Sequence, residues 1–334
     1  MMRSSKFTKS LLAVVMAAAG ISAMAQEKVT VQLKWVPQAQ FAGYYMAAAK
    51  GYYKAEGLDV TIKPGGPDIS PVQVIAGNQA DVVVNWMADA LAAREAGVPL
   101  VNIAQVYNRS GLMLTCAKSS GIKSPKDFKG KTLGVWYGGN EYPLFNWLAK
   151  LGYKTETDVK IVKQAFNVDA LLQKQADCIS TMIYNEYWQI MDAGVKEKDL
   201  LPFFYEDQGV ALLEDGLYVM EDKLKDPAFV AKMGKFVKAS LKGWNDAVKD
   251  PEAAAKAVVA ADMSGSSNMK VQKRQMENVA KLITAAGTKK MGYLEPAAYE
   301  RTVKVLLTGG SSPVIKKDPG KAGYSHAIWD AAQK

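Results

Sequence analysis

The same sequence pattern occurs twice in this chain. In the first copy, a predicted helix over residues 71–77 leads into Gln79–Ala80–Asp81 and an apolar strand over residues 82–84. Further along, Gln175–Ala176–Asp177 precedes a strand over residues 178–183, and in both copies a polar and aromatic turn and another helix follow. Apolar strands without alternation are typical of parallel sheets covered by helices on both faces. The repetition therefore predicts two similar α/β lobes.

The two predicted lobes differ in how the chain builds them. We expect the second lobe to span residues 108–207, inserted between the halves of a first lobe made of residues 26–107 and 208–334. A chain that crosses twice between lobes can open and close about those crossings. The last part of the chain should complete the first lobe with helices that begin at Pro and end near Gly. These helices are predicted over residues 228–248, 251–261, 269–285 and 296–307.

The N-terminus has the composition of an export signal. Arg3, Lys6 and Lys9 precede an apolar run over residues 11–21 that is too short to span a bilayer, and Ala23–Met24–Ala25 forms a small-x-small cleavage site. We therefore expect a signal peptide over residues 1–25 and a soluble, monomeric periplasmic protein, without a lipid anchor because no Cys follows the site. Removal of the three cations lowers the formal net charge from +9 to +6. No Lys/Arg-rich block remains to suggest a nucleic-acid partner.

The chain has two cysteines, Cys116 and Cys178, and a single histidine, His326. An exported protein can form a disulfide, but the sequence does not fix whether the two sulfur atoms meet. The favoured interpretation is two buried thiols that pack as small hydrophobic groups. No Cys or His partner lies at the spacing of metal ligands, so we expect neither a metal site nor a cofactor.

Aromatic, amide and acidic residues follow the strands of both predicted lobes. In open α/β sheets, ligands bind beyond the carboxyl ends of the strands. The residues predicted to bind the ligand are Trp35, Gln38, Gln40, Phe41, Tyr44, Asn85, Trp86 and Tyr107 in the first lobe, and Gly138, Gly139, Asn140, Glu141, Tyr184, Asn185, Glu186 and Trp188 in the second. Rings and amides beside carboxylates favour a neutral or weakly basic planar heterocycle. They disfavour sulfate, phosphate or a sulfonate, because an oxyanion site would exclude acids such as Glu141 and Glu186.

Several of these residues also have a purely structural interpretation. Trp86 and Trp136, taken singly, are more typical of a core than of a ligand site. The pair Gly138–Gly139 can be a tight turn capped by Asn140, and it lacks the G-x-G-x-x-G spacing of a dinucleotide site. Glu186 can simply favour the positive end of its helix. Their joint location at strand ends is the stronger argument for a ligand site.

Three segments carry a family resemblance: Leu33–Lys34–Trp35–Val36–Pro37, residues 47–59 and residues 77–81. They resemble the periplasmic substrate-binding proteins of ABC importers, in the branch of the formylaminopyrimidine-binding proteins and the fungal thiamine-pyrimidine synthases. The resemblance covers about residues 28–225. It implies a type II two-lobe periplasmic binding protein fold, a ligand cleft between the lobes and an ABC transporter permease as partner. The implied ligand is a thiamine pyrimidine precursor or a riboflavin-like vitamin, with a sulfonate or taurine as the alternative.

The chain departs from the pyrimidine branch in two ways. After Pro37, where that branch usually has an Asn-x-Asn-His-like stretch, this chain has Gln38–Ala39–Gln40–Phe41. A Phe in place of the His removes a polar contact and adds a ring face, which favours a larger, flavin-like ligand. The Cys-rich motif and iron-site His of the fungal enzyme are also absent from the matching segment. Enzymatic pyrimidine synthesis is therefore disfavoured. An exported enzyme that uses Glu141, Glu186 or Asp89 as acid or base is also the less favoured hypothesis, because the sequence shows no nucleophile–base pair, metal cluster or phosphate loop, and we expect a binding protein without enzymatic activity.

Overall fold

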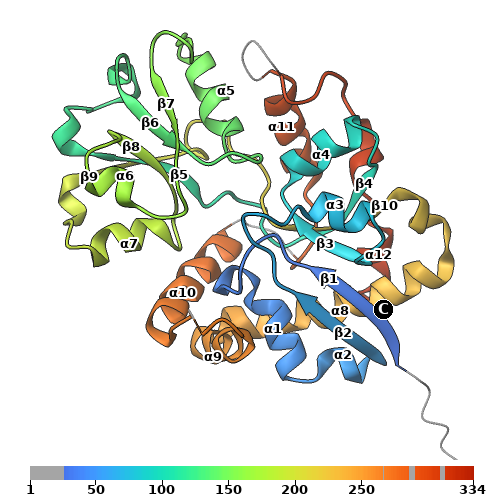
Figure 1. The fold of residues 1–334 in the computed structure, drawn as a ribbon. Helices are drawn as coiled ribbons and strands as arrows, with labels where there is room; N and C mark the ends of the chain where they lie inside the picture. The colour runs from blue at the N-terminus through green and yellow to red at the C-terminus, as the bar shows by residue number, and fades with distance from the viewer. Residues whose placement is uncertain (1–25, 266, 286–289, 309–312) are drawn as a thin grey trace, which may run out of the picture.

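The computed structural model describes residues 26–265, 267–285, 290–308 and 313–334. The predicted signal peptide, residues 1–25, lies outside the described residues. Figure 1 shows two α/β lobes: the second, in green, and the first, made of the blue and the yellow-to-red parts of the chain. In the part of the chain that is described, no helix is both long and apolar enough to cross a membrane.

The first lobe is built on a five-stranded sheet in the order β2-β1-β3-β10-β4. Its strands are β1 (Glu27–Gln32), β2 (Leu58–Lys63), β3 (Val82–Asn85), β4 (Leu100–Gln105) and β10 (Gly216–Met220). Strand β1 pairs in parallel with β2 and β3, whereas β10 runs antiparallel to β3 and β4.

The second lobe repeats this plan in the order β7-β6-β8-β5-β9. Its strands are β5 (Leu112–Ala117), β6 (Thr132–Val135), β7 (Lys160–Lys163), β8 (Cys178–Met182) and β9 (Leu200–Phe204). Here β6 is parallel to β7 and β8, and β5 is antiparallel to β8 and β9. Both sheets are therefore mixed, whereas the apolar strands alone are typical of a parallel sheet. Strands β5 and β10 each enter their sheet directly from the other lobe, at the edge where the parallel strands end, and so must run the opposite way.

Helices cover both sheets. Early in the first lobe lie the 3₁₀ turn η1 (Ala39–Phe41) and helices α1 (Ala42–Ala49), α2 (Tyr52–Ala55), α3 (Pro71–Ala76) and α4 (Met87–Glu95). The second lobe has α5 (Tyr142–Lys150), α6 (Asp169–Leu172) and α7 (Glu186–Asp192). The C-terminal part adds α8 (Pro227–Lys249), α9 (Pro251–Ala261), α10 (Met269–Ala285), α11 (Pro296–Leu307) and α12 (Ala327–Ala331). The predicted bounds of α9, α10 and α11 agree with the structure. Shorter 3₁₀ turns are η2 (Lys118–Ser120), η3 (Pro125–Asp127), η4 (Glu197–Asp199), η5 (Glu221–Lys225) and η6 (Gly320–Gly323).

Glycines let α1 pack closely against α8. A Cβ atom at Gly43 would lie 2.1 Å from Cγ of Trp244, and a Cβ atom at Gly243 would lie 2.1 Å from the carbonyl oxygen of Gly43. Because any side chain at either position would force the helices apart, this contact fixes where the chain after β1 begins α1. The loop between β1 and α1 is thereby held at the carboxyl end of the sheet.

The repeated Asp makes the same bonds in both lobes. Asp81 accepts a hydrogen bond at Oδ2 from the backbone N–H of Thr30 (2.8 Å), and Asp177 accepts one at Oδ2 from the N–H of Thr132 (2.8 Å). Each therefore ties the strand it precedes to the neighbouring parallel strand. Among the described residues other than glycine, positive φ occurs only at Asn78 and Lys174, three residues before these aspartates. The sequence repeat is thus a repeat of backbone geometry as well.

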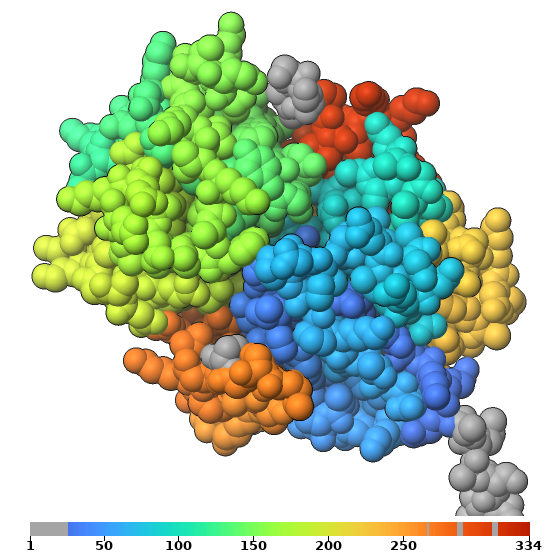
Figure 2. All heavy atoms as spheres, viewed as in Figure 1, coloured from blue at the N-terminus to red at the C-terminus, as the bar shows by residue number. Residues whose placement is uncertain are grey.

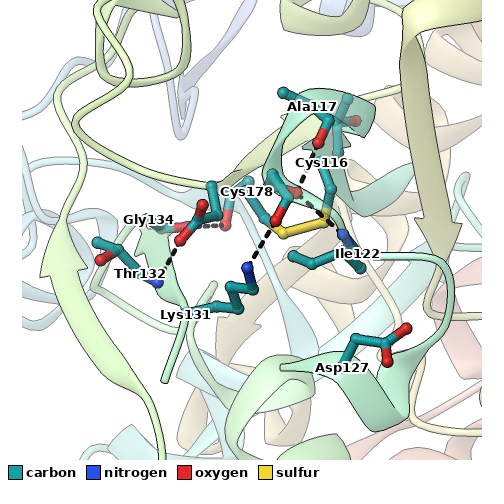
Figure 3. The surroundings of a disulfide bond; sticks show 12 residues. Cys116, Ala117, Ile122, Asp127, Lys131, Thr132, Gly134 and Cys178 are labelled. Carbon is teal, nitrogen blue, oxygen red and sulfur yellow. Dashed lines mark hydrogen bonds between the residues drawn. A yellow bond between two sulfur atoms is a disulfide. The ribbon is translucent and has the colours of Figure 1, made fainter. Parts of the chain in front are cut away.

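Cys116 and Cys178 form a disulfide (Figure 3). The interpretation as two free thiols is therefore wrong, although both residues are fully buried as that interpretation expected. The pairing follows from the antiparallel register of β5 and β8, which places the two cysteines directly opposite each other. The sequence does not reveal that β5, the strand after the crossing, inserts next to β8.

The chain crosses between the lobes in the β4–β5 and β9–β10 connections, where the predicted boundaries at residues 107/108 and 207/208 fall. Glu214, in the β9–β10 connection, is hydrogen-bonded to the β4–β5 connection. Its Oε1 accepts hydrogen bonds from Ser110 Oγ (2.7 Å) and from the backbone N–H groups of Gly111 (2.6 Å) and Leu112 (3.0 Å). Burial raises the pKa of Glu214 to about 8.

Candidate functional site

A cavity of about 650 Å³ lies between the lobes. It is lined by the segments that follow β1, β2 and β3 in the first lobe and β6, β7 and β8 in the second. Its volume is within the range of roughly 300–1,000 Å³ that is typical of small-molecule sites. Figure 2 shows the green second lobe lying directly against the blue and orange segments of the first, so the cavity is bounded from both sides.

Nine of the sixteen residues predicted to bind the ligand line this cavity. They are Trp35, Gln38, Gln40, Trp86, Gly138, Asn140, Tyr184, Asn185 and Glu186. All of them follow the carboxyl end of a strand, which is the rule that selected them.

Phe41, Tyr44 and Tyr107 lie in the core of the first lobe, not on the cavity wall, so the prediction for these three residues needs correction. Their exposed fractions are 0%, 1% and 0%. Tyr44 and Tyr107 each meet the ring of Trp244 edge-on, at centroid distances of 5.7 and 5.9 Å. The chain already turns into η1 at Ala39, and this turn directs Phe41 and the first residues of α1 inward.

Four other predicted residues lie behind the cavity wall: Asn85, Gly139, Glu141 and Trp188. Asn85 accepts a hydrogen bond at Oδ1 from the N–H of Trp86 (2.9 Å) and donates from Nδ2 to Asp89 Oδ2 (2.7 Å). Glu141 accepts at Oε2 from the N–H of Gly139 (2.8 Å). Trp188 donates from Nε1 to the carbonyl oxygen of Ile183 (2.9 Å). The bonds of Asn85 hold two lining residues, and those of Glu141 and Trp188 fix the backbone next to lining residues. None of the four is a lining residue itself.

The sequence-based set missed several lining residues. The two connections that follow β2 and β7 contribute residues 66–71, which include Asp68 and Ile69, and Phe166. Residues after β2 and β7 also lie beyond the carboxyl ends of strands, so the same rule could have predicted them from the sequence. Lys34, beside Trp35 in the same loop, was also missed, as were Val36, Gln73, Met182 and Gln189. Trp136, which on its own is typical of a core, also lines the cavity, as do Asp89 and Tyr137.

Aromatic rings from both lobes meet at the mouth of the cavity. Trp35 and Phe166 face each other with their ring centroids 4.6 Å apart. Trp86 lies deeper in the first lobe, with the ammonium group of Lys34 5.7 Å from its ring centroid. Lys34 Nζ also lies 3.4 Å from Asn85 Oδ1.

Asp215 is a buried acid that holds Gln40, one of the lining residues of the first lobe. Gln40 donates from Nε2 to Asp215 Oδ2 (3.1 Å). Burial raises the pKa of Asp215 to about 6, against the opposing effect of Lys34 and the bond from Gln40. An ionised carboxylate can only accept hydrogen bonds, so it holds the Gln40 amide with Nε2 inward and leaves Oε1 as the acceptor available to a ligand.

Glu186 is the corresponding acid of the second-lobe wall. It stands at the start of α7, where Oε2 accepts from the N–H of Met182 (3.0 Å) and Oε1 accepts from Asn185 Nδ2 (2.6 Å). Burial raises its pKa to about 7, and these bonds only partly offset the rise. Near neutral pH, Glu186 can therefore present either an acceptor or a donor to a ligand.

Among the described lining residues, one cation faces three carboxylates: Lys34 against Asp68, Asp89 and Glu186. Asp215 and Glu141 lie close behind: burial raises the pKa of both carboxyl groups, and the nearby Lys34 opposes part of that rise. This balance favours a ligand that is neutral or weakly basic and that carries N–H donors, and it disfavours an anion. Within the described ranges no three His, Cys, Asp or Glu side chains are grouped as metal ligands.

The family model described as "NMT1/THI5 like" matches residues 38–254. Among curated proteins, the riboflavin-binding protein RibY of Chloroflexus aurantiacus is 28% identical over 239 residues, which are 68% of this chain and 64% of that protein. The formylaminopyrimidine-binding protein of Halalkalibacterium halodurans is 27% identical over 267 residues, 76% of this chain and 78% of that protein. A pyrimidine phosphate synthase of Saccharomyces cerevisiae, THI11, is 26% identical over 244 residues, 68% and 69% of the two chains. The match to the riboflavin-binding relative thus spans less than two thirds of its length.

Solved structures share the fold. The periplasmic sulfonate-binding protein SsuA of Methylobacillus flagellatus superposes with a TM-score of 0.65 at 17% identity, covering 92% of this chain and 94% of that one. The aliphatic sulphonate-binding protein SsuA of Escherichia coli gives 0.63 at 13%, covering 84% and 85%. At these identities the likeness concerns the fold alone. It confirms the predicted two-lobe periplasmic binding protein architecture.

Proposed function

This chain belongs to the NMT1/THI5-like family, and from that premise we propose that it is the periplasmic substrate-binding protein of an ABC importer. It captures a planar nitrogen heterocycle, a riboflavin-like vitamin or a thiamine pyrimidine precursor, between its lobes and delivers it to the permease. The riboflavin- and formylaminopyrimidine-binding relatives support this ligand class.

The observation that carries the proposal is the composition of the cavity wall. Both lobes contribute rings, among them Trp35 and Trp86 from the first and Tyr184 from the second. Hydrogen-bonding groups stand beside them: Gln40 in one lobe and Glu186 in the other. Flat faces with edge-on acceptors are the arrangement that binds an aromatic ring by stacking and reads its N–H groups by hydrogen bonds.

The cavity has room for a ring system larger than a single pyrimidine. A volume of about 650 Å³ suits a ligand of several fused rings or a ring with a side chain. The Phe41 substitution gives no support for this choice, because that ring lies in the core and cannot face a ligand. The volume therefore admits a flavin-like ligand as well as a pyrimidine precursor, and the ligand panel decides between them.

A thermal-shift panel tests the proposal. Riboflavin, formylaminopyrimidine, hydroxymethylpyrimidine, thiamine and cytosine are compared with taurine and alkanesulfonates. A bound ligand at a hundredfold excess over its dissociation constant adds about 2.7 kcal/mol to the free energy of unfolding. We expect at least one heterocycle to raise the melting temperature and the sulfonates to have no effect. Stabilisation by a sulfonate alone would contradict the proposal, and chemical conversion of a bound heterocycle on prolonged incubation would favour the enzyme hypothesis.

A further inference from the structure

Helix α10 carries two buried glutamines one turn apart. Gln272 and Gln275 are 4% and 2% exposed, although both belong to a helix with many charged residues. Residues three positions apart lie on the same side of a helix. Buried amides are retained where they make specific hydrogen bonds, so the partners of these two side chains show what this face of α10 does.

Gln272 holds the ligand loop of the first lobe. Its Oε1 accepts a hydrogen bond from the backbone N–H of Ala39 (2.8 Å). Ala39 stands between Gln38 and Gln40, which both line the cavity, and it begins the turn η1. The bond therefore fixes the point at which the loop turns and the direction in which its two glutamines leave the backbone.

Gln275 holds the ligand loop of the second lobe. Its Nε2 donates to Asn185 Oδ1 (2.7 Å), an atom that also accepts from Gln189 Nε2 (3.0 Å). With Oδ1 occupied by two donors, the Asn185 amide must point its Nδ2 the other way, toward Glu186 Oε1 at 2.6 Å. The chain of bonds thus runs from the first lobe, through Asn185, to the carboxylate that lines the cavity.

Contacts beside Gln275 dock α10 against the second lobe. The guanidinium group of Arg274 binds the carboxylate of Asp192 on α7, with Nη1 2.9 Å from Oδ1. The same group lies 5.2 Å from the ring centroid of Trp188. Figure 1 shows α10, in orange, at the side of the first lobe that faces α7. One helix of the first lobe is therefore in contact with the ligand loops of both lobes.

We propose that α10 is a positioning element of the ligand site, in which Gln272 sets the glutamine loop of the first lobe and Gln275, through Asn185, sets the carboxylate of Glu186 in the second. The proposal rests on the proposed function in placing the ligand in this cavity. Gln272 and Gln275 do not line the cavity and act through the residues they hold.

The test compares Gln275→Met and Gln272→Met with Lys273→Ala. Methionine preserves length and apolar packing but forms neither hydrogen bond. Lys273, between the two glutamines, is 45% exposed and pairs with Glu252 (3.1 Å), so its removal leaves the ligand loops untouched. Two quantities are measured: riboflavin affinity by calorimetry, and the pKa of Glu186 by ¹³C NMR of glutamate-labelled, ligand-free protein.

We expect Gln275→Met to weaken riboflavin binding about fivefold and to raise the pKa of Glu186 by about half a pH unit. Asn185, then held at Oδ1 by Gln189 alone, becomes a less firmly fixed donor to the ionised Glu186. The other charged groups among the described lining residues, Lys34, Asp68 and Asp89, are unchanged. Gln272→Met should weaken binding by a similar factor and leave the pKa of Glu186 unchanged. The double variant Gln275→Met/Glu186→Gln should bind no more weakly than Glu186→Gln alone, since both act on one interaction.

An unchanged Glu186 pKa in Gln275→Met would overturn the proposal, and so would a response of the same size in Lys273→Ala. If riboflavin does not bind the wild-type protein, the NMR titration still decides the proposal, whereas the proposed function is judged by the ligand panel. Gln275→Asn, whose shorter amide cannot reach Asn185, is the second variant should Gln275→Met not fold.

Discussion

The two lobes share a strand order and a repeated Asp, but the strand that follows this Asp, β3 in the first lobe and β8 in the second, is stabilised differently in each. In the first lobe, Asp81 also binds the ammonium group of Lys232 on α8 (3.0 Å), a helix of 23 residues that packs across the lobe. In the second, the helices are short, and the residue after Asp177 is Cys178, which is bonded to Cys116. The strand after the repeated Asp is thus stabilised by a disulfide in the smaller lobe and by an ion pair to a long helix in the larger lobe.

The largest expected effect comes from removing that link. The disulfide joins residues separated by 62 positions, so the Cys116→Ala/Cys178→Ala variant should lose about 4 kcal/mol of unfolding free energy. The loss should fall on the second lobe, and amide hydrogen exchange in β5 and β8 should accelerate while β1 and β3 stay protected. Equal acceleration in both lobes would show that the lobes do not differ in this way.

The repeated aspartates should have the next largest effect. Asp81→Ala and Asp177→Ala each leave a backbone N–H without its charged acceptor, and each should cost about 2 kcal/mol in urea unfolding. Lys232→Met is the control for the additional ion pair of the first lobe and should cost less than about 1 kcal/mol, because that pair is partly exposed. If Asp177→Ala is silent and Asp81→Ala is not, the two copies are not equivalent.

The acid of the second-lobe wall should make stability depend on pH. Folding raises the pKa of Glu186 from 4.5 to about 7, so the folded state holds the proton more tightly. The free energy of unfolding should therefore fall as pH rises through this window. Glu186→Gln should raise the melting temperature of the empty protein at pH 8 and change it little at pH 4. A larger gain at pH 4 would contradict the buried carboxylate with a raised pKa described above.

The smallest expected effect on stability concerns the residue with left-handed backbone conformation that lies three positions before each repeated Asp. Asn78 (φ 54°) and Lys174 (φ 55°) occupy the same place in the two copies, but asparagine tolerates this conformation better than lysine. Lys174→Gly should stabilise the protein by about 1 kcal/mol, and Asn78→Gly should change stability by only a few tenths. Thermal melts of the two variants decide this, and a greater gain at Asn78 would reverse the comparison.

Much of the architecture could be predicted from local patterns. The bounds of α9, α10 and α11 follow from Pro, Gly and helical periodicity, and the repeat around Asp81 and Asp177 predicts two lobes. The antiparallel strands β5 and β10 could not be predicted, because their place depends on where the chain returns from the other lobe. The disulfide was missed for the same reason, since it requires β5 to lie beside β8.

The candidate site was predictable only where its residues follow strands. Trp35, Gln40 and Glu186 follow strand ends and line the cavity, whereas Phe41, the residue directly after Gln40, points into the core because the chain turns there. The burial of Gln272 and Gln275 could not be predicted from the sequence, because amides on a helix rich in charged residues are usually exposed to solvent. Their role depends on which elements pack against the helix. Such long-range contacts between α10 and both ligand loops are a property of the tertiary structure.

Calorimetric titration of riboflavin and formylaminopyrimidine into the wild-type protein and into Glu186→Gln tests the central claim most directly, with taurine as the control ligand. The account predicts one heterocycle bound per chain, an affinity at least tenfold weaker in Glu186→Gln, and no heat with taurine. Binding of taurine in the absence of any heterocycle binding, or a heterocycle affinity that Glu186→Gln leaves unchanged, would contradict it.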